Sequence, residues 1–262
     1  MVRGLRCIML IVLLVSGLTN VVAQAVSRNT AFSVGERFTL DAYFNLGAIW
    51  IKLGEAEFSV EEEEDNYKFI VTAHNVPKWD RIYQMNTYHE ASCTKDMKPL
   101  YMRCKVSENG NYYEDSYIFM EKGDSYEVHR HTKNKQKFPS GEFDTTFVVS
   151  LAAHDIINSV YVARNMDLTQ NNGKKIPFSP IFGNGIHTIY GDVIGKEKIK
   201  TRENKIYKCM KGAAYVGDGT IVDGKTPVYV YVTDDEHLIP VLVEAKLSIG
   251  SVKVYLRDCQ LK

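Results

Sequence analysis

The feature that most constrains this chain is an alternation of apolar and polar residues with a period of two, which recurs along most of its length. Phe38, Leu40 and Ala42 alternate with Thr39 and Asp41, as in a β-strand that has one buried face and one wet face. Similar alternation recurs in segments 56–60, 67–73, 100–106, 117–119, 126–131, 186–194, 207–215, 227–233, 241–249 and 252–256. The sequence therefore predicts many half-buried strands.

Turn signals separate these segments at intervals of about ten residues. Asn109-Gly110 is a strong hairpin signal, and Lys122-Gly123-Asp124 marks a second hairpin. Acidic residues from Glu61 onwards are typical of a solvated turn. This spacing predicts a mainly β fold in which an antiparallel sheet curls into a sandwich or a barrel-like form.

One segment follows a helical period instead. Between Thr145 and Arg164, apolar residues recur at helical spacing, and Asp144 is placed to cap the first turn. We expect one amphipathic helix of about 15 residues, packed on the sheet.

The first residues are typical of a secretory signal peptide. Arg3 and Arg6 precede a short apolar run, and Ala23-Gln24-Ala25 offers small residues for cleavage. We expect a signal peptide at 1–25, followed by a single β-rich domain at 26–262, although two smaller domains would also fit the length. Cys7 stands before or within the apolar run rather than at its end, so a lipid-anchored cysteine is not expected. The predicted location is the periplasm or the exterior, with no membrane span after cleavage.

The charge balance argues against nucleic acid as a partner. The chain has 32 Lys and Arg against 32 Asp and Glu, and loss of the signal peptide removes two arginines, which leaves a net charge of −2. Binding to nucleic acid normally requires a strongly basic face.

Four cysteines remain after the signal peptide, an even number that suggests two disulfides in an oxidising compartment. Three connectivities are open, and nearness in sequence favours Cys93 with Cys104 and Cys209 with Cys259. The alternative is that one or both pairs are free buried thiols, because cysteine also behaves as a small hydrophobic residue. The absence of a C-x-x-C pair argues against a zinc site.

Other polar groupings have plain structural explanations. His129 and His131 share one strand face, but several lysines and an arginine surround them and would repel a cation. The run Asp234–His237 forms a turn whose side chains diverge, and Gly183–Gly185 lacks the rest of a phosphate-binding loop. No serine-hydrolase elbow is present. The sequence therefore predicts no catalytic residue, no metal and no cofactor, and enzyme activity is the less favoured expectation.

Aromatic residues are the remaining functional signal. Trp79 and Tyr83 flank charged residues in one short stretch, and Trp50 stands between Gly47 and Gly54, where a strand would bend. Such rings line grooves for small molecules or glycans, so Trp50, Trp79 and Tyr83 are the candidate ligand-binding residues. The simpler explanation is that tyrosine suits half-buried strands.

Several phrases together resemble a known family. They are Phe32–Glu36, Trp50–Ala56, Asp155–Arg164 and the stretch from Thr233 to Val241 that runs on to Gly250-Ser251-Val252. The chain is similar along nearly all of its mature length to bacterial exported proteins of the domain of unknown function 3108 family. That resemblance implies an exported protein with a mostly β fold, and it implies no catalytic residue.

Three hypotheses follow for the function. The favoured one is a non-enzymatic envelope protein that binds an apolar or glycan ligand, or an envelope partner, in the concavity of a curled sheet. The alternatives are a hydrolase that acts on envelope or dietary polymers and a structural partner of an outer-membrane assembly. Converging carboxylates would favour hydrolysis, and a flat apolar patch would favour assembly.

Overall fold

The computed structural model describes residues 28–137, 140–166, 176–178, 180–182, 185–186, 189–216, 227–247 and 249–262. The predicted signal peptide lies outside these residues. Strands form most of the described chain, together with one α-helix, α2 (Ile156–Arg164), and one 3-10 turn, η2 (Pro77–Trp79). The strands are β1 (Arg37–Leu46), β2 (Ile49–Glu63), β3 (Asn66–Asn75), β4 (Met85–Cys93), β5 (Pro99–Glu108), β6 (Asn111–Lys122), β7 (Ser125–Lys133), β8 (Glu142–Ser150), β9 (His154–Asp155), β10 (Ile176–Phe178), β11 (Pro180–Phe182), β12 (Gly185–Ile186), β13 (Ile189–Lys200), β14 (Ile206–Val216), β15 (Val228–Thr233), β16 (Pro240–Lys246) and β17 (Ser251–Gln260).

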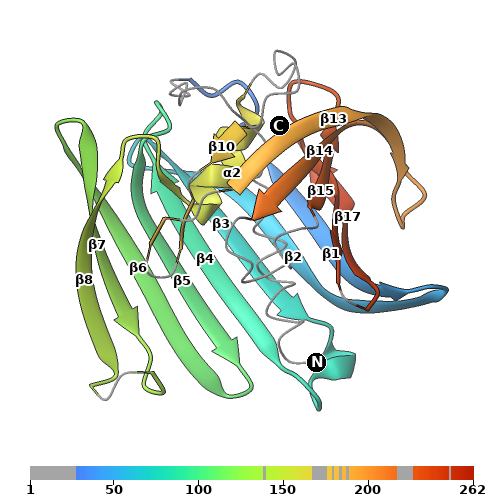
Figure 1. Ribbon diagram of the computed structural model, residues 1–262, viewed down its shortest axis with the longest axis horizontal. Coiled ribbons are helices and arrows are strands. Elements are labelled where there is room, and N and C mark those ends of the chain that lie inside the picture. Colours follow the sequence, from blue (N-terminus) through green and yellow to red (C-terminus); the bar gives the residue numbers. More distant parts are fainter. Residues whose placement is uncertain are drawn as a thin grey trace.

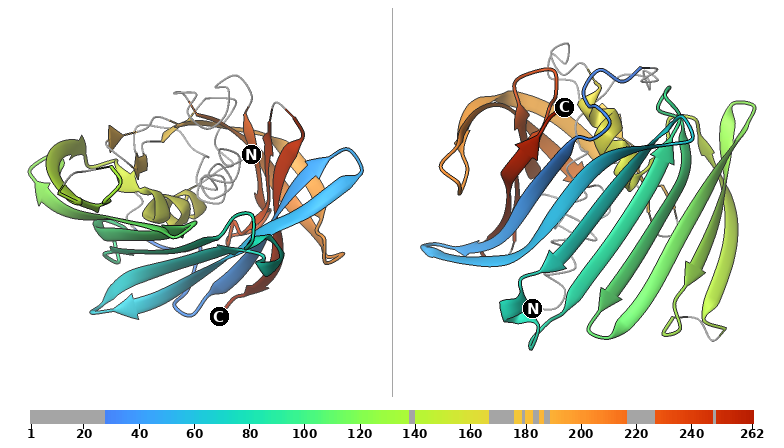
Figure 2. Two further views of the ribbon diagram at one scale, coloured as in Figure 1. Left: turned by 90° about the horizontal axis from the view of Figure 1, so that it is seen from below. Right: turned by 180° about the vertical axis from the view of Figure 1, so that it is seen from behind.

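Fourteen strands form one antiparallel sheet with the order β10-β13-β14-β15-β16-β17-β1-β2-β3-β4-β5-β6-β7-β8. Hairpins join β1 to β8 in sequence order, and β17 returns to pair with β1. The sheet curls without closing, and α2 lies against its inner side (Figures 1 and 2). The prediction of a curled antiparallel sheet with one helix is confirmed.

The alternation in the sequence separates two faces of this sheet. Phe38 pairs across the strands with Phe58, and their buried rings stack 4.7 Å apart on the side that α2 covers. We call this side the inner face and the opposite side the outer face. Asp41 and Tyr43 belong to the outer face, because they alternate with the inner residues of β1.

The predicted helix is shorter than expected and begins later. The segment from Thr145 to Ser150 is part of β8, whose ladder pairs it with β7. β-branched residues such as Thr145, Thr146 and Val149 suit that ladder, and the helical spacing of the apolar residues there was misleading. The helix starts after Asp155, which caps it by accepting hydrogen bonds at 2.9 Å from the backbone N–H groups of Ile157 and Asn158.

All nine residues of α2 are buried, so the helix is part of the core rather than a cover with one wet face. Tyr161 stacks on Phe69 of β3 with ring centroids 3.8 Å apart. Phe32 packs edge-on against Tyr161 at 5.1 Å and against Phe69 at 5.4 Å. This three-ring cluster fixes the helix on the inner face, and such aromatic pairs contribute about 0.5–1.5 kcal/mol each beyond their buried area.

A bulge bends β2 beside Trp50. Ala42 pairs with Gly54, but Tyr43 pairs with Lys52, so β2 carries an extra residue at this point. A β-carbon on Gly54 would lie 2.3 Å from the carbonyl oxygen of His74, and this close approach of β3 explains the glycine. The predicted strand bend between Gly47 and Gly54 is therefore present.

The predicted disulfides are not formed. Cys93, Cys104, Cys209 and Cys259 all carry free thiols. Register explains the first pair: Cys104 stands opposite His89, whereas Cys93 lies four residues further along β4 and pairs with Pro99. That offset is about 13 Å along the strand, far beyond the roughly 4.4–6.8 Å between Cα atoms that a disulfide needs.

Candidate binding site on the inner face

A row of polar side chains crosses the inner face of β4 to β7. Its members are neighbours in the strand register: His89 pairs with Cys104, Cys104 with Asp115, and Asp115 with Thr132. On the other side of His89, the cross-strand neighbours in the same register are the apolar residues Val71, Phe58 and Phe38. The inner face thus changes from apolar to polar between β3 and β4. Polar residues in a buried sheet face are more informative than apolar ones, because each needs a hydrogen-bonding partner.

An ion pair anchors the β6–β7 end of this polar row. Arg130 donates to Asp115 through Nη2 at 2.8 and 2.9 Å and through Nε at 3.1 Å. Thr132 donates its hydroxyl to the same carboxylate at 2.5 Å. The side chain of Arg130 is only 4% exposed, and the ring of Tyr117 lies 5.6 Å from the guanidinium. A buried, multidentate pair of this kind holds its groups in a fixed geometry.

The β4 end of the row contains polar atoms without a protein partner. His89 is 2% exposed, and its Nε2 lies 3.9 Å from the sulfur of Cys104. Among the described residues, its Nδ1 has no hydrogen-bonding partner, and neither does the hydroxyl of Thr87, which is two residues away on the same face. Leaving a buried polar group unpaired costs about 1–3 kcal/mol. These two groups therefore retain unused hydrogen-bonding capacity.

Burial also decides the protonation of the His89–Cys104 pair. It lowers the pKa of His89 to about 4 and raises the pKa of the Cys104 thiol well above its usual range. Both groups are neutral near pH 7, so the pair is not an activated thiolate with an imidazolium partner. The pair can offer hydrogen bonds, and its electrostatics do not favour nucleophilic attack.

Tyr83 is the predicted ligand residue that lies nearest this face. It precedes β4 by two residues and donates its hydroxyl to Glu108 at 2.8 Å. Met85 stands opposite Glu108 in the register, and its sulfur lies 3.7 Å from the same hydroxyl. Tyr83 is 5% exposed and lies beside the first residue of β4.

Trp50 and Trp79 lie elsewhere. Trp50 is on the outer face with Tyr43 and Tyr255, whose ring centroids are each 6.3 Å from its own. Trp79 ends η2 and donates its indole N–H to the backbone carbonyl of Lys52 at 2.8 Å. Both side chains are mostly buried. The structure therefore does not bring the three predicted residues into one site.

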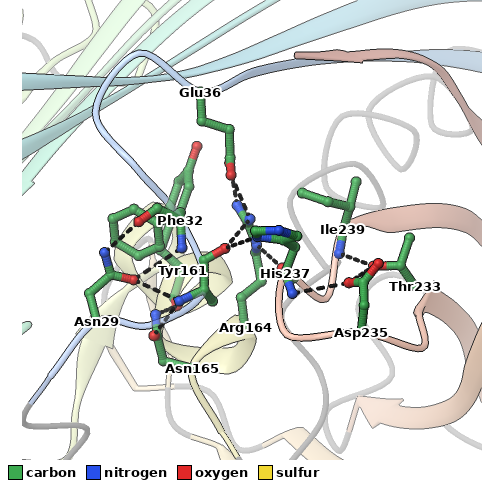
Figure 3. Close-up of polar contacts among 11 residues, drawn as sticks. Asn29, Phe32, Glu36, Tyr161, Arg164, Asn165, Thr233, Asp235, His237 and Ile239 are labelled. Atoms are coloured by element: carbon green, nitrogen blue, oxygen red, sulfur yellow. Dashed lines mark hydrogen bonds and ion pairs between the residues drawn. The ribbon is translucent and has the colours of Figure 1, made fainter. Parts of the chain in front are cut away.

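A second polar cluster holds α2 in place. Arg164, at the end of the helix, forms a bidentate ion pair with Glu36 at 2.5 and 2.8 Å, and both side chains are at most 3% exposed. The guanidinium also donates to the carbonyl oxygens of Ala31 at 3.1 Å and His237 at 2.9 Å (Figure 3). Three of the four phrases that carry the family resemblance, Phe32–Glu36, Asp155–Arg164 and Thr233–Val241, meet at this arginine. We call this cluster the Arg164 clamp.

The groups considered for catalysis and metal binding are separated. His129 contacts Glu127 at 3.0 Å, and His131 contacts Asp144 at 2.7 Å, so each imidazole has its own carboxylate. Asp235 accepts hydrogen bonds from Thr233 and from the backbone N–H of His237, as expected of a turn residue (Figure 3). Among the described residues, no group of three or more His, Cys, Asp or Glu side chains is placed to hold a metal ion. The segment Gly183-Asn184 lies outside the described residues.

The polar row was missed in the sequence because its members come from four strands. Arg130 lies between His129 and His131 on β7 and faces the opposite way, into the core. The signal was present as charged or polar residues at inner positions of the alternation. Only the register shows that these positions are neighbours.

Fold and site together define a class of proteins with an open, curled antiparallel sheet whose inner face carries a helix. The chain belongs to the family described as "Protein of unknown function (DUF3108)", whose model matches residues 37–257. No curated protein matches the chain. It is similar in fold to a crystal structure of a β-barrel-like protein of domain of unknown function DUF1849 from Brucella abortus. The TM-score is 0.59 and the identity 8%, with 89% of this chain and 100% of that chain covered.

In the part of the chain that the structure describes, no helix is both long and apolar enough to cross a bilayer.

Proposed function

We propose that this chain is an exported, non-enzymatic protein of the cell envelope that binds an amphiphilic small molecule on its inner sheet face. The observation that carries the proposal is the pair of buried, unpartnered polar groups on β4, His89 Nδ1 and the Thr87 hydroxyl. His89 stands between Cys104 of the polar row and the apolar Val71, and Thr87 stands between the apolar Val106 and Ala73. A ligand that has an apolar body and a hydroxyl or carbonyl group would satisfy both.

Binding is favoured over hydrolysis by the protonation of the row. The buried thiol and imidazole are neutral at pH 7, and the carboxylate of Asp115 is already occupied by Arg130 and Thr132. A hydrolase would need an activated nucleophile or a general base that is free to accept a proton. The row instead consists of groups suited to hold and orient a polar head.

The test is mass spectrometry of small molecules extracted from protein purified natively from its own compartment. Wild type is compared with a Thr87→Val, His89→Leu double variant and with Thr201→Val. Thr201 is a matched control, because its hydroxyl is also buried and unpartnered but lies in the β13–β14 turn.

We expect wild type and the control to carry the same extracted molecule, and the double variant to lose at least about 90% of it. Retention of the molecule by the double variant, or an empty wild-type protein, would overturn the proposal. A purely structural role predicts a different result: the double variant would then gain stability in urea, because it no longer buries unpaired polar atoms.

Export is part of the proposal and is tested separately. It rests on the basic, apolar and small-residue segments of 1–25 and on membership of a family whose resemblance implied exported proteins. Fractionation followed by N-terminal sequencing should find the protein in the periplasm, beginning near Val26. A cytoplasmic chain that retains Met1 would contradict it.

A further inference from the structure

One end of the sheet exposes aliphatic side chains in two turns that lie next to each other. The β1–β2 turn presents Leu46, Ala48 and Ile49, with Leu46 43% and Ile49 57% exposed. The neighbouring β16–β17 turn presents Ile249, which is 69% exposed. We call Leu46, Ala48, Ile49 and Ile249 the apolar tip.

The two turns lie side by side. Asn45 pairs with Ser251, and a β-carbon on Gly250 would lie 2.4 Å from the Asn45 carbonyl oxygen. Both views of the ribbon show the β1–β2 hairpin projecting beyond the neighbouring strands (Figures 1 and 2). The apolar tip is therefore the leading edge of a projection and can touch a flat surface before the body of the protein does.

Three other turns of the same sheet are polar, whereas Ile82 and Ile206 are single exposed aliphatic residues in or next to two further connections. β2 and β3 are joined by Glu64-Asp65, β5 and β6 by Asn109-Gly110, and β6 and β7 by Gly123-Asp124. Polar residues of this kind are usual in solvated turns. Several exposed aliphatic residues gathered at one projecting point instead indicate a contact with something apolar.

Behind the tip lies a belt of aromatic and basic residues on the outer face. The rings of Tyr43, Trp50 and Tyr255 form one cluster. The Arg202 guanidinium lies 4.8 Å from the centroid of Trp50, and the Lys253 ammonium lies 5.8 Å from it and 3.2 Å from the carboxylate of Glu244. From the tip inwards, aliphatic residues are followed by amphipathic rings and then by cations. A bilayer has matching layers in the same order, from the acyl chains to the interface and the charged headgroups.

We propose that the apolar tip docks this protein on a membrane surface that contains anionic lipid. Leu46, Ile49 and Ile249 enter the acyl boundary, the Trp50 cluster lies at headgroup level, and Arg202 contacts lipid phosphates. This mode of binding is peripheral and reversible, because the inserted area is limited to a few side chains. It is independent of any ligand on the inner face, which lies on the other side of the sheet.

The test is flotation of the purified mature protein with lipid vesicles. One set of vesicles contains phosphatidylethanolamine and phosphatidylglycerol at about 3:1, and the other contains phosphatidylcholine alone. Wild type is compared with a Leu46→Asn, Ile49→Asn variant. The matched control is Ile118→Asn, Val148→Asn, which removes two aliphatic side chains that are 51% and 66% exposed on β6 and β8.

We expect wild type and control to float with the anionic vesicles and to bind phosphatidylcholine at least about tenfold more weakly. The partition coefficient of the tip variant onto anionic vesicles should be about a hundredfold lower than that of wild type, because burial of each aliphatic side chain strengthens binding about tenfold. Its residues are exposed, so its urea midpoint should match that of wild type. In a Trp79→Phe background, the fluorescence of Trp50 should shift to the blue on anionic vesicles.

Three outcomes would overturn the inference. They are absence of wild-type flotation, equal flotation of the tip variant, and equal binding to both kinds of vesicle. Capture of a protein partner through Leu46 and Ile49 without any vesicle binding would assign the tip to a protein interface instead.

Discussion

His89 occupies an inner, buried position in the alternation of β4. It is the first polar residue of the row next to the apolar part of the inner face. Its neighbours in the register are Val71 on one side and Cys104 on the other, so the change from apolar to polar occurs at this imidazole. Burial keeps the ring neutral by lowering its pKa to about 4. A neutral imidazole can both donate and accept a hydrogen bond, which suits a polar head of either kind.

The lowered pKa of His89 predicts a loss of stability in mild acid. Below pH 6.5 the unfolded chain takes up a proton on this imidazole, whereas the folded protein does so only near pH 4. The contribution of His89 to the free energy of unfolding is therefore fully present above pH 6.5, and up to about 3 kcal/mol of it is lost as the pH drops to 4. His154 has the same depressed pKa and adds to the loss.

Asp155 acts in the opposite direction, because burial raises its pKa to about 6 and the folded state binds that proton first. The variant His89→Gln isolates one imidazole from these terms. Urea unfolding at several pH values should show a shallower decline between pH 6.5 and 4 for this variant than for wild type. Parallel curves for the two proteins would show that His89 is solvated.

The four thiols should be present and slow to react. Burial raises the pKa of Cys93 and Cys104 far above the usual range, that of Cys209 to about 12 and that of Cys259 to about 11. A thiol reagent at pH 8 should therefore modify Cys259 first, since it is the least buried, and the others only on unfolding. Fewer than four reactive thiols in freshly unfolded protein would restore the disulfide hypothesis.

At the scale of elements, α2 depends on the Arg164 clamp. Arg164 joins the helix to Glu36 before β1 and to the β15–β16 turn through the His237 carbonyl (Figure 3). Three parts of the chain that are distant in sequence are thereby tied together. A buried ion pair is weak evidence for net stability, but removal of one partner leaves the other charge uncompensated.

A double-mutant cycle tests the clamp. Arg164→Met alone should lower the free energy of unfolding by about 3–5 kcal/mol, and Glu36→Gln alone by a similar amount. The double variant should be less destabilised than the sum of the two, because no lone charge stays buried. Urea unfolding measures all three. Additive losses would indicate that Arg164 acts through its backbone carbonyl contacts rather than through Glu36.

The same scale shows what sequence patterns can and cannot predict. Period-two alternation predicted β1 and β3 well, because each has one face buried against a common core. The last strands were also expected, although β16 and β17 bury residues on both faces. It failed from Thr145 to Ser150, where apolar spacing fitted a helix but pairing with β7 decided for a strand. The cap at Asp155, rather than at Asp144, marked the true start of α2.

At the scale of the whole molecule, the candidate site depends on the pairing register of β4 to β7, which cannot be deduced from the sequence. His89, Cys104, Asp115 and Thr132 are separated by 11 or more residues each and become neighbours only when β4 to β7 pair in one specific alignment. A shift of one residue in any of these strands would turn its side chain to the outer face. The aromatic pattern singled out Tyr83, which contacts Glu108 and Met85, but the row itself could not be predicted.

The open sheet also has an edge strand that the sequence patterns do not identify. β8 is the last strand in the order of the described sheet, and it exposes Phe143 and Val148, which are 42% and 66% exposed. A long edge strand with exposed apolar residues is a template for pairing with another chain. We expect this edge to limit solubility at high concentration.

Val148 stands opposite Glu127 of β7. A positive or a negative side chain at position 148 therefore tests the edge strand. Val148→Lys places a cation across from the carboxylate and should reduce self-association, with a change in stability of at most about 1 kcal/mol. Val148→Glu adds the same polarity but a like charge, so it should be the less stable of the two by a few tenths of a kcal/mol. Light scattering at increasing concentration and urea unfolding measure both effects. If both variants associate as wild type does, the surface that limits solubility is not β8, and the apolar tip of the β1–β2 hairpin is then the next surface to test.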